Sequence, residues 1–125
     1  MAGEPSPVRE VRSARFVYAV RARFADAATR ARFVSWLVEG HLADVVRAGA
    51  EEAELVDLAP TEDSPFGDVE ARYRFADQAA FERYESGPAV ALRAEGRERF
   101  PPEAGVAMTR STGMSRVSWR GAAGR

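Results

Sequence analysis

The sequence predicts a single α+β domain built from two similar halves. Arg21-Ala22-Arg23-Phe24-Ala25-Asp26 returns as Arg72-Tyr73-Arg74-Phe75-Ala76-Asp77, and each copy ends a strand-like alternation and precedes a helix-like stretch. Aromatic residues and a glycine follow both copies at similar distances. A chain of 125 residues is long enough for one hydrophobic core and too short for two. We therefore expect the element order β-α-β-β-α-β within one domain.

In the first half, residues 14–24 alternate in character, which predicts a strand with Phe16 and Tyr18 on one face and arginines on the other. Asp26 is the expected N-cap of the helix that follows, because its carboxylate can accept unsatisfied amide hydrogens. The apolar residues of this helix form two nearly opposite stripes. Either the helix bends at Gly40-His41, or a second subunit covers its outer side.

The second half repeats this order. The acidic segment Glu52–Leu58 is typical of an edge strand, and residues 69–75 alternate like the first strand. Asp77 is the expected cap of a second helix, which Gly87-Pro88 interrupts and restarts. The last strand is expected over residues 104–111, with one face made of small side chains.

The order βαββαβ is that of the ferredoxin-like fold, in which a four-stranded antiparallel sheet carries both helices on one face. We place this domain at residues 13–113, after a mobile N-terminal tail over residues 1–12. Residues 114–125 form a C-terminal tail, in which Val117 and Trp119 indicate partial docking. The open sheet face combines charges with aliphatic residues, which is typical of a binding surface or a dimer interior.

Composition excludes several kinds of chemistry. The chain has no cysteine, which removes thiolate catalysis and Cys-type metal sites, and its lack of lysine removes Schiff-base chemistry. A net charge of −1 argues against nucleic-acid binding. No apolar run approaches the roughly 18 residues of a membrane span, and no signal sequence is present, so we expect a cytoplasmic protein without membrane contact. No pattern indicates a metal or a cofactor.

Several segments resemble an uncharacterised family of the dimeric α/β-barrel superfamily. They are Tyr18-Ala19-Val20, the helix with Trp36 and His41, Tyr73-Arg74-Phe75, and the stretch from Glu82 to Phe100. The resemblance spans about residues 16–110. It implies two ferredoxin-like subunits that put their open sheet faces together as a homodimer, often around a ligand. That superfamily includes antibiotic-biosynthesis monooxygenases and muconolactone-isomerase-like proteins, so the resemblance implies a fold without naming an activity.

His41, the only histidine, is the candidate catalytic residue, because imidazole titrates near neutral pH. The alternative is that it packs at a helix bend and bonds a carbonyl. The candidate ligand-binding residues are the following: Arg21, Arg23, Arg72, Arg74 and Trp36. Guanidinium groups suit carboxylate, phosphate or enolate oxygens. The alternative is that the arginines pair with Glu70, Glu54 or acids of a partner subunit.

Three functions follow. The first is a small-molecule site between the sheet faces of a homodimer, acting without a cofactor as a monooxygenase, isomerase or cyclase on an anionic or aromatic compound. The second is a non-catalytic structural or regulatory homodimer, and the sequence does not decide between these two. The third is RNA binding by the open sheet face, which needs exposed aromatic residues where this chain has arginine.

Overall fold

The structure, a computed structural model, describes residue 3, residues 7–11 and residues 15–121. The expected tails therefore lie partly outside the described residues. The elements run in the order β1 (Val8–Val11), β2 (Phe16–Phe24), α1 (Ala27–Trp36), η1 (Leu37–His41), α2 (Leu42–Arg47), β3 (Glu52–Asp57), β4 (Val69–Phe75), α3 (Gln78–Ser86), α4 (Pro88–Arg99), η2 (Pro102–Ala104), β5 (Val106–Met114) and β6 (Ser118–Gly121).

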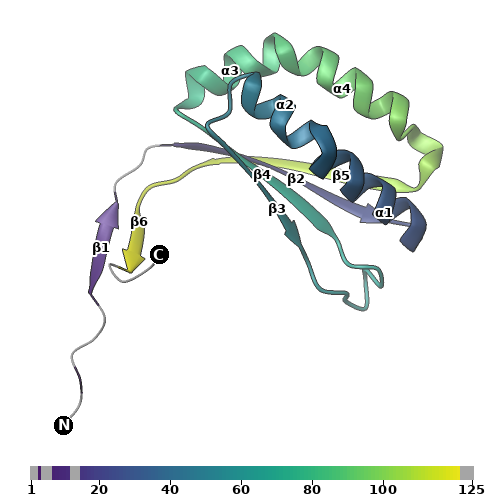
Figure 1. Ribbon diagram of the computed structural model, residues 1–125, viewed down its shortest axis with the longest axis horizontal. Coiled ribbons are helices and arrows are strands. Elements are labelled where there is room, and N and C mark those ends of the chain that lie inside the picture. The colour runs from purple at the N-terminus through teal and green to yellow at the C-terminus, as the bar shows by residue number, and fades with distance from the viewer. Residues whose placement is uncertain (1–2, 4–6, 12–14, 122–125) are drawn as a thin grey trace.

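The main sheet is four-stranded and antiparallel, with the strand order β3-β4-β2-β5. All the long helices cover one of its faces and leave the other open (Figure 1). This arrangement confirms the predicted ferredoxin-like fold, including the central position of the two strands that end in the repeated segment. No helix in the described ranges is long and apolar enough to cross a membrane.

The two halves begin their helices in the same way. The carboxylate of Asp26 accepts the backbone amide hydrogen of Thr29 at 2.7 Å, and that of Asp77 accepts the amide hydrogen of Ala80 at 2.8 Å. The hydrogen bond from Thr29 holds the pKa of Asp26 below its usual value. Both aspartates therefore act as the predicted N-caps, which fixes where the chain leaves the sheet.

The first helix contains a π-helical turn, η1, between α1 and α2. The amide of Leu42 bonds the carbonyl of Leu37, five residues back, so the turn holds one residue more than an α-helical turn. This extra residue changes the direction in which all later side chains of the helix point around its axis. Phe33, Leu37 and Val45 are consequently all buried, although a straight α-helix would turn Val45 away from the other two. The irregularity predicted at Gly40-His41 is thus a π-turn.

The core falls into two clusters, because the helix-facing side chains are bulky at both ends of the sheet and small in its middle. Val20 of β2 lies beside Ala71 of β4 at the centre. One cluster includes Phe16, Tyr73, Phe75 and Phe81, and the other includes Phe24, Phe33, Leu37 and Phe100. The small central pair leaves space between them.

The first and last strands, β1 and β6, pair with each other and form a two-stranded ribbon outside the main sheet, which we call the arm (Figure 1). Neither segment shows a strand pattern in the sequence, because each is short and is ordered only by its pairing with the other. β5 also extends to Met114, beyond the predicted end, and the amide of Ser115 continues its ladder by bonding the carbonyl of Arg15 at 2.9 Å.

Asp68 anchors the connection between β3 and β4. It is 6% exposed and accepts hydrogen bonds from the Nε and Nη2 atoms of Arg23, at 3.1 and 3.3 Å, and from the hydroxyl of Ser64. These hydrogen bonds, with that of Arg23 the strongest, hold the pKa of Asp68 below its usual value. The carboxylate is therefore charged in the folded protein at neutral pH.

We predict that Asp68→Asn destabilises the protein at pH 7 by about 1–2 kcal/mol, because the amide NH2 group that replaces Oδ2 cannot accept the hydrogen bond from Nη2 of Arg23 and the charge that pairs with this guanidinium is lost. The pKa of Asp68 is lower in the folded state, so its contribution is present above the unfolded value, near pH 4, and is lost as the pH falls through the folded value. Urea unfolding at pH 7 and pH 3 measures both effects. Asp57→Asn is the control, since the exposed pair of Asp57 with Arg30 contributes less. Equal losses for the two variants at pH 7 would contradict the prediction.

Candidate functional site

A cavity of about 340 Å³ lies between the helix-covered face of the sheet and the helices. Val20 and Ala71 form its floor at the centre of the sheet, and Trp36 and His41 from the first helix face Leu92 of α4 across it. Its volume is at the lower end of the range for small-molecule pockets, which begins near 300 Å³. The gap between the two core clusters is therefore large enough for a ligand.

The π-turn places Trp36 and His41 together at this cavity. Their rings stack with centroids 4.1 Å apart and an interplanar angle of 22°. Residues five apart point roughly 140° away from each other on an α-helix, whereas a π-turn brings them to the same side. Gly96 of α4 makes room for the indole, because a Cβ atom there would lie 3.3 Å from Cη2 of Trp36. The stack is thus a product of the irregular turn.

Both rings of this stack keep a buried nitrogen without a hydrogen-bond partner among the described residues, Nε1 of Trp36 and Nδ1 of His41. Leaving a polar group buried and unpaired costs about 1–3 kcal/mol. The indole nitrogen can only donate, while a neutral imidazole can also accept. These two atoms are the buried polar groups of the site that lack a partner.

Burial lowers the pKa of His41. The nearby carboxylates of Glu95 and Asp44 favour the charged ring but offset only part of this effect. His41 is therefore neutral at pH 7 and able to accept a proton, which is the state that a general base requires.

Three arginines line the cavity, Arg93 and Arg97 from α4 and Arg110 from β5. The Nε atom of Arg110 donates a hydrogen bond of 2.9 Å to the hydroxyl of Tyr18. Among the described residues, no aspartate or glutamate lines the cavity. Its charged groups are thus all cations, which favours a ligand with an acceptor or anionic oxygen.

Two further tyrosines, Tyr73 and Tyr84, add hydroxyl groups to the lining. Burial raises the pKa of Tyr73 well above its usual value, and burial together with the nearby Tyr18 raises the pKa of Tyr84 to about 12. Both phenols stay protonated at neutral pH. They are available as hydrogen-bond donors to a ligand oxygen, alongside the arginines.

The structure separates the sequence-predicted site residues into two groups. His41 and Trp36 line the cavity. The four arginines Arg21, Arg23, Arg72 and Arg74 lie on the open face of the sheet, where each has a carboxylate within 4 Å. Arg21 and Arg72 make the pairing with Glu70 and Glu54 that the sequence offered as the alternative, whereas Arg23 pairs with Asp68 and Arg74 with Glu52. A ligand-binding role for these arginines stays a prediction.

Glu70 is the centre of this open-face network. It accepts hydrogen bonds from Arg72 at 2.6 Å and from Arg21 at 3.2 Å. Burial alone would raise the pKa of Glu70, but these two guanidinium groups outweigh it and hold the pKa below its usual value. The arginines are thus occupied by internal partners.

Sequence reasoning missed the cavity arginines and Tyr84. Two signals could have found them. Arg110 continues the face of β5 that carries Val106 and Met108, and a cation on a core-facing strand position needs an explanation. On α4, Leu92 and Gly96 are four residues apart, and so are the arginines that follow each of them. This spacing places all four residues on one side of the helix.

No protein-family model and no curated protein sequence matches the chain. Several solved structures, however, have the same fold as this chain. A dimeric ferredoxin-like protein from an uncultured marine organism is 14% identical, with 82% of this chain and 96% of that chain covered and a TM-score of 0.57. SnoaB, a cofactor-independent oxygenase from Streptomyces nogalater, is 17% identical, with 83% and 95% covered and a TM-score of 0.58.

A monooxygenase from the gene ActVA-Orf6 of Streptomyces coelicolor, solved in complex with Nanaomycin D, is also similar. It is 17% identical, with 82% of this chain and 88% of that chain covered and a TM-score of 0.59. At these identities the likeness is one of fold. The chain therefore has the ferredoxin-like fold of these proteins, which confirms the fold implied by the sequence resemblance.

We predict that stability falls below about pH 6.5 because of His41. Its pKa is lower in the folded state than the unfolded value near 6.5, so protonation favours the unfolded chain. The loss begins as the pH drops below the unfolded value and cannot exceed about 1.4 kcal/mol per pH unit for one proton. Denaturant midpoints at pH 7.5 and 5.5 measure it. The His41→Gln variant should lose most of this difference, and an unchanged difference would show that other groups cause it.

We also predict opposite effects of two glycine substitutions in the helices. Gly40→Ala has open space around its new methyl group and should stabilise the protein by up to about 1 kcal/mol through helix propensity. Gly96→Ala gains the same propensity but pushes against the indole of Trp36. Thermal unfolding should therefore place Gly96→Ala below Gly40→Ala, with a shift in tryptophan fluorescence. Equal stabilities and unchanged fluorescence would mean that Trp36 does not depend on Gly96.

Proposed function

We propose that this protein binds a small aromatic molecule carrying an acceptor or anionic oxygen in the cavity and removes a proton from it, acting as a homodimer without a cofactor. The observation that carries the proposal is the buried, unpartnered Nδ1 atom of His41 at a cavity whose charged lining is entirely cationic. A neutral base and fixed cations are the two components that enolate-forming chemistry needs.

The chemistry follows from these positions. His41, neutral at pH 7, accepts the proton from a carbon that an adjacent ring or carbonyl makes acidic. Negative charge then develops on the ligand oxygen, and Arg97, Arg110 or the phenol of Tyr73 stabilises it by donating hydrogen bonds. Oxygenation, isomerisation and cyclisation of such compounds can all begin with this step. The aromatic lining from Trp36 and Tyr84 suits a flat ring.

The comparisons support this proposal. Two of the similar folds belong to a cofactor-independent oxygenase and to a monooxygenase solved in complex with the ligand Nanaomycin D. A third is described as dimeric. They make small-molecule chemistry and a homodimer reasonable for this chain, while the residues that would perform the reaction come from the cavity itself.

The homodimer is proposed to form through the open sheet face. That face carries Val17 and Ala19 of β2 beside small residues of β5, in register with Gly113 and Ser111. Its charges are already paired within the chain, so a second copy can cover them without leaving a buried charge alone.

The test is hydrogen–deuterium exchange of 2-tetralone, an aromatic ketone with an acidic carbon, followed by NMR. The wild-type protein should accelerate the exchange, and His41→Gln should reduce the acceleration by at least about 100-fold, as for loss of a general base. Ala71→Leu, which fills the cavity floor, should reduce it similarly while the fold is kept. Ala91→Leu, on the exposed side of α4, is the matched control and should exchange like the wild type. Exchange that is insensitive to both His41→Gln and Ala71→Leu would refute the site.

A further inference from the structure

The arm, β1 with β6, extends the neighbouring strands β2 and β5 beyond the sheet. β2 and β5 are linked through the hydrogen bond from Ser115 to Arg15, and the arm continues from there after a bend. It projects toward the side of the sheet opposite the helices (Figure 1). The arm therefore lies on the side where the open face is exposed.

The arm is exposed on nearly all sides and carries large apolar side chains. Val8 is 64% exposed and Trp119 is 62% exposed, and the strand register places both on the same face of the ribbon. Met114 and Val117, which lie in the chain between the middle of β5 and the arm, are exposed as well. A two-stranded ribbon is marginally stable in water unless it packs against something else. The exposed indole indicates that this face of the arm is normally covered.

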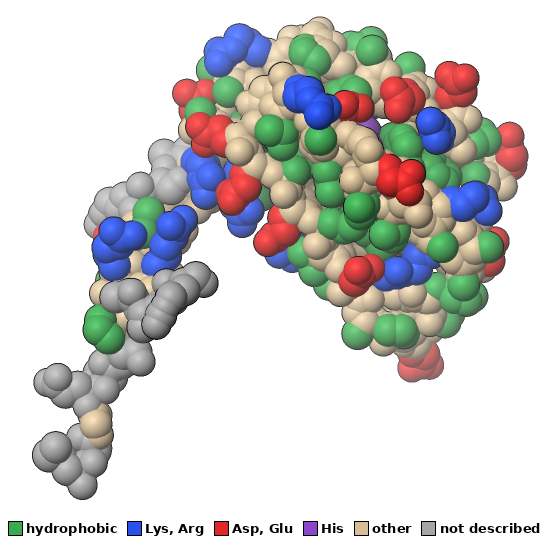
Figure 2. Space-filling model, in the orientation of Figure 1, with side chains coloured by type: hydrophobic (Ala, Val, Ile, Leu, Met, Phe, Trp, Pro, Cys, Tyr) green, Lys and Arg blue, Asp and Glu red, His purple; other side chains and the backbone are tan. Residues whose placement is uncertain are grey.

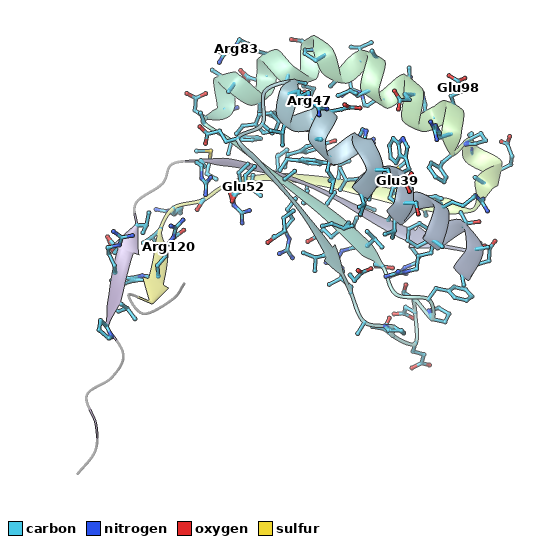
Figure 3. The ribbon with its side chains drawn as sticks, viewed as in Figure 1. Glu39, Arg47, Glu52, Arg83, Glu98 and Arg120 are labelled. Carbon is cyan, nitrogen blue, oxygen red and sulfur yellow. The ribbon has the colours of Figure 1, made fainter. Side chains whose placement is uncertain are left out.

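The charges of the arm give the same indication. Arg9 and Arg120 lie directly opposite each other across the ribbon, and neither forms an ion pair with any residue that the structure describes. Like charges in this position are unfavourable without a carboxylate nearby. Residues 8–14 and 115–121, the arm with its two connections, hold four arginines and one glutamate, whereas the whole chain has a net charge of −1, so the remainder is acidic. Figures 2 and 3 show basic side chains on the arm, with Arg120 away from the body of the domain.

We infer that the arm clasps a second copy of this chain. The inference rests on the proposed homodimer and adds to it a second contact, outside the sheet faces. The arm projects on the side of the open face, carries the exposed side chains of Val8 and Trp119 on one face, and is basic where the rest of the chain is acidic. In a two-fold dimer both arms make the same contact, so each copy holds the other.

The edge of the main sheet also favours a second copy of this chain as the partner of the arm. β5 is an edge strand of nine residues, and its outer side pairs with no strand in the described chain. Long, exposed edge strands are usually covered or blunted by charge. Because the arm begins where β5 ends, a copy that packs beside β5 also lies within reach of Trp119 and Arg120.

The test compares two double variants of the full chain by sedimentation velocity over a dilution series. Val8→Ser with Trp119→Ser removes the apolar face of the arm. Val38→Ser with Val90→Ser removes equally exposed apolar residues from the helices and is the matched control. The arm variant should raise the dimer Kd at least 100-fold, while the control should stay within about threefold of the wild type. Arg9→Glu with Arg120→Glu is a second arm variant, which should also weaken the dimer. It tests the same surface independently, in case the first variant does not fold.

The fluorescence of Trp119 reports its burial directly. The chain has two tryptophans, so Trp36→Phe leaves Trp119 alone, and its emission should shift to shorter wavelength as the concentration passes the dimer Kd. A wild-type dimer that both arm variants leave unchanged would overturn the arm contact and keep the homodimer. A wild-type monomer at 100 µM would overturn both, while 2-tetralone exchange would still test the cavity independently. Unshifted Trp119 emission in the dimer would show that a different partner covers the arm.

Discussion

The structure depends on how the helix-covered face of the sheet is filled. Aromatic side chains pack at both ends of β2 and at the C-terminal end of β4, and the small pair Val20 and Ala71 lies at the middle of these strands. A uniformly bulky face would close the core along its whole length. This alternation of large and small residues instead keeps the helices apart at the middle of the sheet, so the cavity follows from packing and needs no loop or lid to form it.

The π-turn connects this packing constraint to chemistry. One extra residue in the first helix buries Leu37 and Val45 against the two core clusters and at the same time stacks His41 on Trp36 at the cavity. Stability and site geometry therefore depend on the same irregular turn. π-turns occur frequently at functional sites, because they reposition side chains that a regular helix would direct elsewhere.

The sequence was sufficient for the fold and for part of the site. Alternation, the repeated segment and the two capping aspartates predicted the sheet, its strand order and the helix-covered face. The location of the cavity was not predictable in the same way, because its volume depends on how side chains from seven elements meet. The pairing of β1 with β6 was likewise hidden, since two short segments far apart in the chain carry no local signal of each other.

The single histidine has a consequence for any kinetic study of this protein. The chain contains neither lysine nor cysteine, and its eighteen basic side chains are all arginine, which remains charged at every accessible pH. The other side-chain types present ordinarily titrate near pH 4 or near pH 10. His41, which lines the cavity, is therefore the one side chain in the sequence whose ordinary pKa lies near neutral pH. A pH–rate profile near neutrality would record the ionisation of this imidazole, the proposed base, and of the substrate, without a background from other histidines, lysines or cysteines.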